Sequence, residues 1–426
     1  MPEPIKIEEV KERVILVGVS EQDGDDAEDS VAELAELVKT AGAVTVGTLI
    51  QKRELIHPGT YVGTGKVQEI ADMIAELGAT GIVCDDELSP AQLKNLEQML
   101  DTKVMDRTLI ILDIFAARAT TSEGKIQVEL AQLKYRLSRL TGLGRSMSRL
   151  GGGIGTRGPG EKKLETDRRH IRRKIDKLKE ELEEVRRVRA TQRQRRRKNE
   201  IPVVAIVGYT NAGKSTLLNA ITGSDIPANN RLFDTLDTTT RLLTVSDTLD
   251  VVISDTVGFI RKLPHQLVEA FKATLEELEY ADLLLHVIDV SNPEWQHQAE
   301  VVEKLIVELG ANEIPRIDVF NKCDRVEAGD LRPHGADICS ISARTGEGVD
   351  RLLEMIDRRL DKGTRRVTIH LPYDKGSLLD MLYREAKVES VEYSETIDIV
   401  AVCPPKVLGQ IGDYTPDWTP PKEDWE

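Results

Sequence analysis

The sequence predicts an α/β protein in four consecutive segments: an N-terminal α/β domain, a long antiparallel helical hairpin, a second α/β domain and a small α+β domain. Two observations favour this division. Strand-like and helix-like apolar patterns alternate over residues 1–115 and again over 201–362, as expected for parallel sheets. Two long helical patterns flank a glycine-rich stretch, which assigns residues 116–200 to the hairpin and leaves 363–426 for the last domain.

Length and composition exclude several classes of protein. The 426 residues, 40% hydrophobic and 31% charged, fit a packed multidomain protein rather than a disordered chain. No apolar run approaches ~18 residues, the N-terminus lacks a basic and apolar signal pattern, and the four cysteines show no paired spacing. We therefore expect a cytoplasmic monomer without stable membrane insertion.

In the N-terminal domain, short apolar runs alternate with stretches whose apolar residues recur every three or four positions. The runs predict strands at Val14–Val19, Val44–Val46 and Gly81–Cys84. The stretches predict helices at Asp29–Ala41, Val67–Leu77 and Pro90–Leu100. For the last domain, similar patterns predict a strand at Val367–Leu371, a helix at Lys375–Lys387, strands near Val391 and at Ile397–Cys403, and a poorly ordered acidic tail.

The predicted hairpin combines long helices with strong positive charge. A proline-free helical pattern covers Thr108–Leu140, and a second covers Glu161 to about Lys198. Residues 142–160 between them are so rich in glycine that no helix is expected there. Lys134 to Glu200 contains 23 Lys/Arg against 9 Asp/Glu, whereas the whole chain has a net charge of −15. This asymmetry predicts a local contact with a polyanion.

The strongest local signal is a stretch that satisfies the phosphate-loop pattern GxxxxGK[ST]. It follows the apolar strand Val203–Val207 and precedes a helical stretch at Thr216–Ile221, which is the required context. Loop N–H groups are expected to face phosphates, with Lys214 beside the β and γ phosphates and the Ser215 hydroxyl on Mg²⁺. The stretch reads Gly208, Tyr209, Thr210, Asn211, Ala212, Gly213, Lys214, Ser215, Thr216.

Three shorter motifs follow in the order that a guanine-nucleotide domain requires. In the motif that begins at Asp255, the carboxylate can hold Mg²⁺ through water and the Gly258 N–H can contact the γ-phosphate. In the motif that ends at Asp324, the carboxylate can accept from guanine N1–H and N2–H₂, a pair of donors that adenine lacks. The motifs are Asp255-Thr256-Val257-Gly258, Asn321-Lys322-Cys323-Asp324 and the base-covering Ser342-Ala343-Arg344. Together they predict a GTPase that cleaves the terminal phosphoanhydride bond.

Three further positions bear on hydrolysis. One threonine of Phe233–Arg241 should bind Mg²⁺ and contact the γ-phosphate. Thr235 and Thr239 are both candidates for this role. Phe259 stands where many GTPases carry a water-orienting glutamine, so we expect slow intrinsic turnover. The Asn211 carbonyl is a hypothetical site for K⁺, the alternative being that Asn211 only braces the loop.

The chain resembles the HflX family of translation-associated GTPases over roughly residues 10–365. The resemblance rests on Gly208–Thr216, Phe233–Arg241, Asp255–Ile260 and the glycine-rich Gly151–Gly160 with the residues after it. It implies a Ras-like G domain, binding to the large ribosomal subunit and a role in splitting or rescuing stalled ribosomes. It also implies that Thr235 binds Mg²⁺ and joins Lys214 and Gly258 in catalysis, and that the nucleotide is lined by Phe233, Asp234, Thr235, Leu236 and Asp237.

The charge of the hairpin supports contact with folded RNA independently of that resemblance. Arginines in the glycine-rich stretch and in Arg193–Lys198 can contact phosphates, and only one aromatic residue, Tyr135, is available for stacking on bases. The alternative is a solvated hairpin whose arginines balance its glutamates. Competing functions are a GTPase in ribosome assembly or another RNA task, and a nucleotide-gated RNA-binding module.

Overall fold

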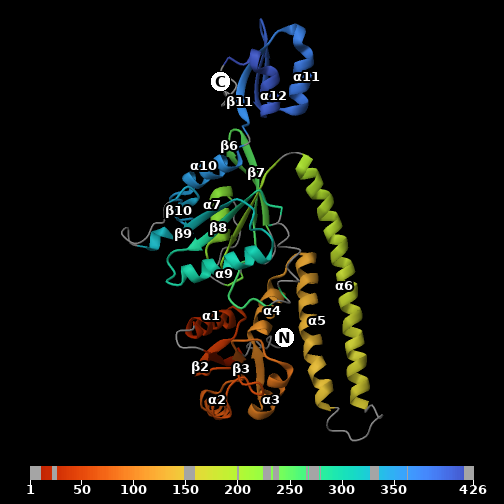
Figure 1. Ribbon diagram of the computed structural model, residues 1–426, viewed down its shortest axis with the longest axis vertical. Coiled ribbons are helices and arrows are strands. Elements are labelled where there is room, and N and C mark those ends of the chain that lie inside the picture. The colour runs from red at the N-terminus through yellow and green to blue at the C-terminus, as the bar shows by residue number, and fades with distance from the viewer. Residues whose placement is uncertain are drawn as a thin grey trace, which may run out of the picture.

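The computed structural model describes residues 11–21, 26–147, 159–198, 201–223, 232–233, 239–264, 267, 278, 280–326, 335–361 and 363–416. Figure 1 shows the N-terminal domain at one end, the C-terminal domain at the other and a central α/β domain between them, with two long helices along one side. Most of the predicted glycine-rich stretch, the acidic tail and Asp234–Asp237 lie outside the described residues.

The N-terminal domain is a parallel sheet in the order β2-β1-β3-β4. Both faces of the sheet are buried, as the continuous apolar run of β1 requires. The Ser89 side chain and Gln92 form a capping box that begins α3 at Pro90, where the sequence predicts it. The elements are β1 (Arg13–Ser20), α1 (Ala27–Thr40), β2 (Val44–Lys52), α2 (Thr64–Leu77), β3 (Gly81–Cys84), α3 (Pro90–Leu100), β4 (Lys103–Asp106) and α4 (Arg107–Arg118).

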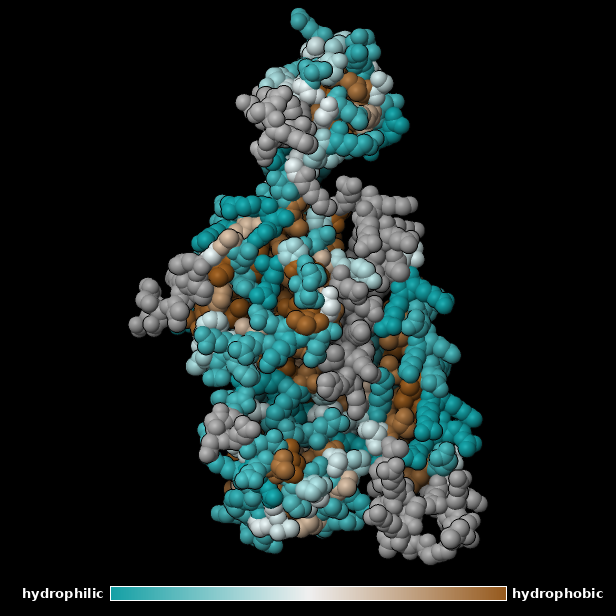
Figure 2. Space-filling model, viewed as in Figure 1, coloured by the Kyte–Doolittle hydropathy of each residue, from teal (hydrophilic) through white to brown (hydrophobic). Residues whose placement is uncertain are grey.

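The hairpin consists of α5 (Ser122–Met147) and α6 (Pro159–Lys198), which lie side by side in Figure 1. Figure 2 shows apolar side chains along the seam between the helices and hydrophilic ones along the outer side. The buried residues of the seam are Leu130, Leu133, Ile175, Leu178 and Leu182.

Two sequence-based expectations about these helices are wrong. Thr108–Leu140 is not one helix, because α4 ends at Arg118 and the Thr121 hydroxyl accepts from the Gly124 N–H at 3.0 Å where α5 begins. Helix also enters the glycine-rich stretch from both sides. A glycine inside a helix costs only about 1 kcal/mol, and a proline is tolerated in the first helical turn, where α6 has Pro159.

The central domain is a six-stranded sheet in the order β10-β9-β8-β5-β7-β6, parallel except for β6. Because β5 lies between β7 and β8, the carboxyl end of β5 faces the crevice in which open α/β sheets bind ligands. The elements are β5 (Val203–Gly208), α7 (Lys214–Thr222), β6 (Thr239–Ser246), β7 (Leu249–Asp255), β8 (Leu283–Asp289), α9 (Trp295–Glu308), β9 (Arg316–Asn321), η1 (Cys323–Arg325), β10 (Ile338–Ser340) and α10 (Val349–Leu360).

The C-terminal domain is an antiparallel sheet, β11-β13-β12, with two helices on one face. Figure 2 shows it as a separate lobe joined to the central domain by a narrow neck. Among the described residues, no helix has both the length and the apolar character needed to cross a bilayer. The elements are β11 (Arg365–Leu371), η2 (Tyr373–Lys375), α11 (Gly376–Glu385), β12 (Lys387–Tyr393), β13 (Ile397–Cys403), α12 (Pro405–Ile411) and η3 (Gly412–Tyr414).

One hydrophobic cluster joins the N-terminal domain to the central domain. Leu37 of α1 and Ile111 and Phe115 of α4 belong to the same buried cluster as Phe259 and Leu284 of the central domain. The N-terminal domain therefore packs beside the carboxyl end of β5, next to the predicted phosphate loop.

Candidate nucleotide-binding site

Two glycines shape the loop between β5 and α7. A Cβ on Gly208 would lie 2.3 Å from the Val287 carbonyl oxygen. Gly213 has φ +98°, and a Cβ there would lie 2.2 Å from Asn321 Nδ2. Both positions require glycine because a neighbouring strand or side chain comes too close for any other residue.

Lys214 begins α7 and directs its ammonium group back into the loop. Its Nζ donates to the carbonyl oxygens of Gly208 at 3.1 Å and Tyr209 at 2.8 Å. Burial lowers the pKa of Lys214 to about 8; Asp255 opposes the shift and the charge of Lys322 adds to it. Phosphate groups beside this ammonium would favour its charged form.

Nucleotide binding near pH 8 is therefore expected to take up protons. About half of the Lys214 side chains are neutral there without nucleotide, so about 0.5 proton should be taken up per nucleotide bound. Titration calorimetry in buffers of different ionisation enthalpy measures this uptake. Equal uptake by a Lys214→Met variant would contradict the assignment.

The same pKa has a consequence for stability. Because it lies below the ordinary 10.5, the unfolded chain binds more protons than the folded one between pH 8 and 10.5. The contribution of Lys214 to the stability of the nucleotide-free protein should thus rise with pH across that window.

Ser215 and Asp255 offer oxygen ligands for a magnesium ion. The Ser215 hydroxyl donates to Asp255 Oδ2 at 2.7 Å, and Asp255 is fully buried at the end of β7. Hydroxyl and carboxylate oxygens fit Mg²⁺, which GTPases of this class use to neutralise the β and γ phosphates. Ser215 would bind the ion directly and Asp255 through water. Thr235, the other predicted ligand, lies outside the described residues.

The backbone that follows β7 lies against the phosphate loop. The Thr210 N–H donates to the Phe259 carbonyl oxygen at 2.7 Å, and the Phe259 N–H donates to the Gly208 carbonyl oxygen at 3.2 Å. A Cβ on Gly258 would lie 2.9 Å from Thr210 Cα and 3.1 Å from Lys214 Nζ. Gly258 is therefore close to the ammonium group that is expected to meet the γ-phosphate.

The residues predicted to recognise the base are joined by hydrogen bonds. Asn321 Nδ2 donates to the Ala212 carbonyl oxygen at 2.8 Å, and Asn321 Oδ1 accepts from the Ala343 N–H at 3.0 Å. The Ser342 hydroxyl donates to Asp324 Oδ1 at 2.8 Å. These bonds tie the two base-side loops to the phosphate loop and orient the Asp324 carboxylate, which has lone pairs left for the two guanine donors.

Lys322 connects the base side to the phosphate loop. Its Nζ donates to the Asn211 carbonyl oxygen at 2.8 Å and to Asp289 Oδ2 at 2.6 Å. Asp289, at the end of β8, is a residue of the candidate site that the sequence analysis missed. Its only sequence signal is its place at the carboxyl end of an apolar run, beside Asn321 in the sheet register.

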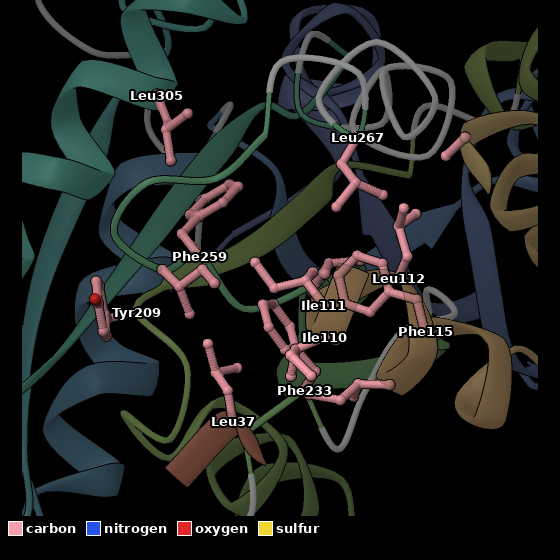
Figure 3. Packing of buried hydrophobic residues seen from close by; sticks show 14 of the residues in the cluster. Leu37, Ile110, Ile111, Leu112, Phe115, Tyr209, Phe233, Phe259, Leu267 and Leu305 are labelled. Atoms are coloured by element: carbon pink, nitrogen blue, oxygen red, sulfur yellow. The ribbon is translucent and has the colours of Figure 1, made fainter. Parts of the chain in front are cut away.

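Phe233 and Phe259 direct their rings into the core between the domains, as Figure 3 shows. The Phe233 N–H donates to Thr210 Oγ1 at 3.2 Å, and its ring meets Phe115 edge-on at 4.6 Å. Phe259 is 1% exposed. A buried phenyl ring offers no group that could orient a water molecule.

The other predicted residues divide between the site and the undescribed part of the chain. Thr256, Val257 and Cys323 are buried beside the loops, Thr216 is partly buried on α7, and Arg344 is exposed. Thr239 lies in β6, in register with Asp255. The residues outside the described part are Asp234, Thr235, Leu236 and Asp237.

Comparison with known proteins identifies the family. Four family models match: "GTP-binding GTPase N-terminal" at residues 28–116, "GTP-binding GTPase Middle Region" at 118–196, "50S ribosome-binding GTPase" at 203–322 and "HflX C-terminal domain" at 332–400. The GTPase HflX of Lacrimispora saccharolytica is 55% identical over 416 residues, 97% of this chain and 98% of that protein. The chain belongs to the HflX family.

A second relative agrees with this membership. The GTPase HflX of Escherichia coli is 43% identical over 385 residues, 89% of this chain and 90% of that protein. A crystal structure of a GTP-binding protein from the archaeon Sulfolobus solfataricus in complex with GDP is 25% identical, covers 82% of this chain and 98% of that one, and has a TM-score of 0.42. As a member of the HflX family with an intact phosphate loop, the chain is a GTPase.

Proposed function

We propose that this HflX-family GTPase binds the large ribosomal subunit through its hairpin, and splits or rescues stalled ribosomes, with hydrolysis stimulated by the ribosome. The observation that carries the proposal is an exposed row of cations on the half of α6 nearest the glycine-rich stretch. Arg169, Arg172, Arg173 and Lys179 are exposed and make no ion pair within the part of the chain that the structure describes.

The spacing of these cations suits a phosphate backbone. Arg169, Arg172 and Arg173 recur at three- and four-residue intervals and so share one face of the helix. The exposed acidic residues of α6 are concentrated one turn or more further along, where Glu183 and Glu184 pair with Arg186 and Arg187. Among the α6 side chains that the structure describes, positive charge is thus concentrated toward the glycine-rich stretch, which favours contact with a polyanion there.

Two features of the nucleotide site support the remaining parts of the proposal. Because Phe259 is buried in the core, the chain lacks a water-orienting side chain at that position, and a bound ribosome is the natural source of the missing group. The exposed Asn211 makes no side-chain hydrogen bond among the described residues, which leaves its side-chain carbonyl oxygen available for K⁺ beside the phosphates, while its backbone carbonyl oxygen accepts from Lys322.

Co-sedimentation with purified large ribosomal subunits tests the RNA contact. An Arg172→Glu/Arg173→Glu variant is expected to bind at least about tenfold more weakly at ~0.1 M salt, with a slope of log affinity against log salt less steep by about 2. An Arg351→Glu/Arg358→Glu variant, which reverses two exposed arginines on α10, serves as the matched control.

The outcomes separate the alternatives. Unchanged binding and slope in the α6 variant would contradict RNA contact by this face. Binding to subunits without dissociation of whole ribosomes, read from light scattering, would favour a role in assembly or another RNA task. Binding that depends on GTP without any stimulation of hydrolysis would favour a nucleotide-gated binding module.

A further inference from the structure

Tyr209, the second residue of the phosphate loop, joins three parts of the molecule. Its hydroxyl accepts from the Arg261 N–H at 2.8 Å, in the segment directly after Phe259. The same hydroxyl donates to the Glu33 carboxylate of α1, which is 176 residues away in the sequence. With 4% exposure, Tyr209 is closed off from water, so these two groups hold its hydroxyl in one place.

Glu33 is held in turn by a buried arginine. Arg107, the first residue of α4, is 1% exposed and donates to Glu33, to Asp85 Oδ1 at 2.8 Å and to the Ser30 carbonyl oxygen at 3.2 Å. Burial raises the pKa of Glu33, although Arg107 opposes the shift. A buried guanidinium requires its carboxylate partners, so a shift of α4 must move Glu33 as well.

The residue before Arg107 is attached to the hairpin. Asp106 accepts at Oδ1 from the Tyr135 hydroxyl of α5 at 2.7 Å, and its other oxygen accepts from Arg139 of the same helix. Asp106 also caps α4 through the Leu109 N–H at 2.9 Å. Because Asp106 and Arg107 are adjacent and both fully buried, α5 and Glu33 are connected through a single peptide unit.

A second set of ion pairs joins the same segment of the central domain to the N-terminal domain. Arg261 Nη1 lies 2.5 Å from Asp26, and Lys262 Nζ lies 2.6 Å from Asp85 Oδ2 and 2.7 Å from Asp86 Oδ1. Burial works to raise the pKa of Asp85, but Arg107 and Lys262 together hold it below its ordinary value. The N-terminal domain thus binds the side chains of residues 261 and 262 directly, and contacts the Arg261 backbone N–H only through Tyr209.

The geometry points to a polar relay, from Tyr135 and Arg139 of the hairpin through Asp106, Arg107 and Glu33 to Tyr209, that couples RNA binding by the hairpin to the position of the Gly258–Arg261 backbone. Tyr209 is in this sense a positioning residue for hydrolysis. The inference rests on the proposed ribosome contact and specifies how that contact reaches the nucleotide site.

Coupling by this route requires an element with two arrangements. The backbone of residues 258–261 is held by hydrogen bonds at Phe259 and Arg261, and these must change if Gly258 is to follow the γ-phosphate. A force on α5 that shifts Arg107 and Glu33 changes the stability of one arrangement relative to the other.

The relay is tested with Tyr209→Phe, which removes one hydroxyl, and Glu33→Gln, which keeps the side-chain shape. GTP hydrolysis is measured against increasing amounts of purified large ribosomal subunits. Each variant should lower the plateau stimulation about tenfold, the factor expected for one hydrogen bond to a charged group. The subunit concentration at half-stimulation should stay constant, since the cations of α6 are intact. The double variant should lose no more stimulation than either single variant, because both substitutions interrupt the same series of hydrogen bonds.

Tyr373→Phe is the matched control, since it removes a hydroxyl that donates to the Ser394 carbonyl oxygen at 2.8 Å in the C-terminal domain. It should leave stimulation unchanged. If subunits stimulate Tyr209→Phe as strongly as the wild type, the relay is overturned and the proposed function is not. The relay is also overturned if the double variant loses stimulation by the product of the two single-variant factors. A parallel loss of GDP affinity would assign the hydroxyl to nucleotide binding and overturn it too. Subunits that bind without stimulating the wild type overturn the proposed function, and the relay with it.

Discussion

Replacing Asp324 with Asn is expected to weaken GTP binding about 10³-fold and to make xanthosine triphosphate the preferred nucleotide. The Asp324 carboxylate is oriented by the Ser342 hydroxyl at 2.8 Å, and guanine presents two donors to it, N1–H and N2–H₂. An amide in its place directs an NH₂ group at one of these donors, so that two donors face each other without an acceptor between them. Xanthine carries an acceptor at C2, which matches the new donor.

Equilibrium titration with fluorescent GTP and XTP analogues measures this exchange of specificity. Asp350→Asn, which changes an exposed carboxylate on α10, is the control for loss of charge. A variant that still prefers guanine by the wild-type factor would show that Asp324 does not read the base. The fold should be unaffected, because Asp324 is exposed and belongs to no hydrophobic core.

Local signals in the sequence were sufficient where the structure depends on local chemistry. The strand before Gly208, the glycine spacing and a helix after the loop follow from one continuous stretch of chain. The structure has them in that order, with α7 beginning at Lys214, two residues before the predicted start. The same holds for α3, whose first turn is defined by Ser89 and Gln92. In such elements the residues that fix the geometry are near neighbours in the sequence.

The sequence failed where geometry depends on distant residues. The break between α4 and α5 depends on a hydrogen bond of Thr121, a residue type that also occurs inside helices. The residues next to Arg107 in the sequence give no sign that it is buried, unlike the many solvated arginines of this chain. It is buried because Glu33 and Asp85, from two other elements, converge on it. Burial of charge is a property of the assembled fold, and so the whole contact between Tyr209 and the N-terminal domain was missed.

Gly213→Ala is expected to weaken binding of GTP and GDP alike, by about 100-fold or more. The position has φ +98°, which costs an L-residue about 1–2 kcal/mol, and the new Cβ would stand 2.2 Å from Asn321 Nδ2. Asn321 must then leave its bonds to Ala212 and Ala343, which join the phosphate loop to the base-side loops. A single added methyl group would therefore displace both the phosphate loop and the base-side loops.

The opposite end of the same helix provides the control. Gly223, the C-cap of α7, also has a left-handed conformation, φ +64°, but a Cβ there would meet nothing within 4 Å. Gly223→Ala should therefore cost about 1 kcal/mol of folding free energy and leave nucleotide affinity unchanged. Thermal unfolding and titration with labelled GDP, applied to both variants, separate backbone strain from the clash with Asn321. Equal affinities of the two variants would mean that strain alone accounts for Gly213, and that its contact with Asn321 does not hold the site together.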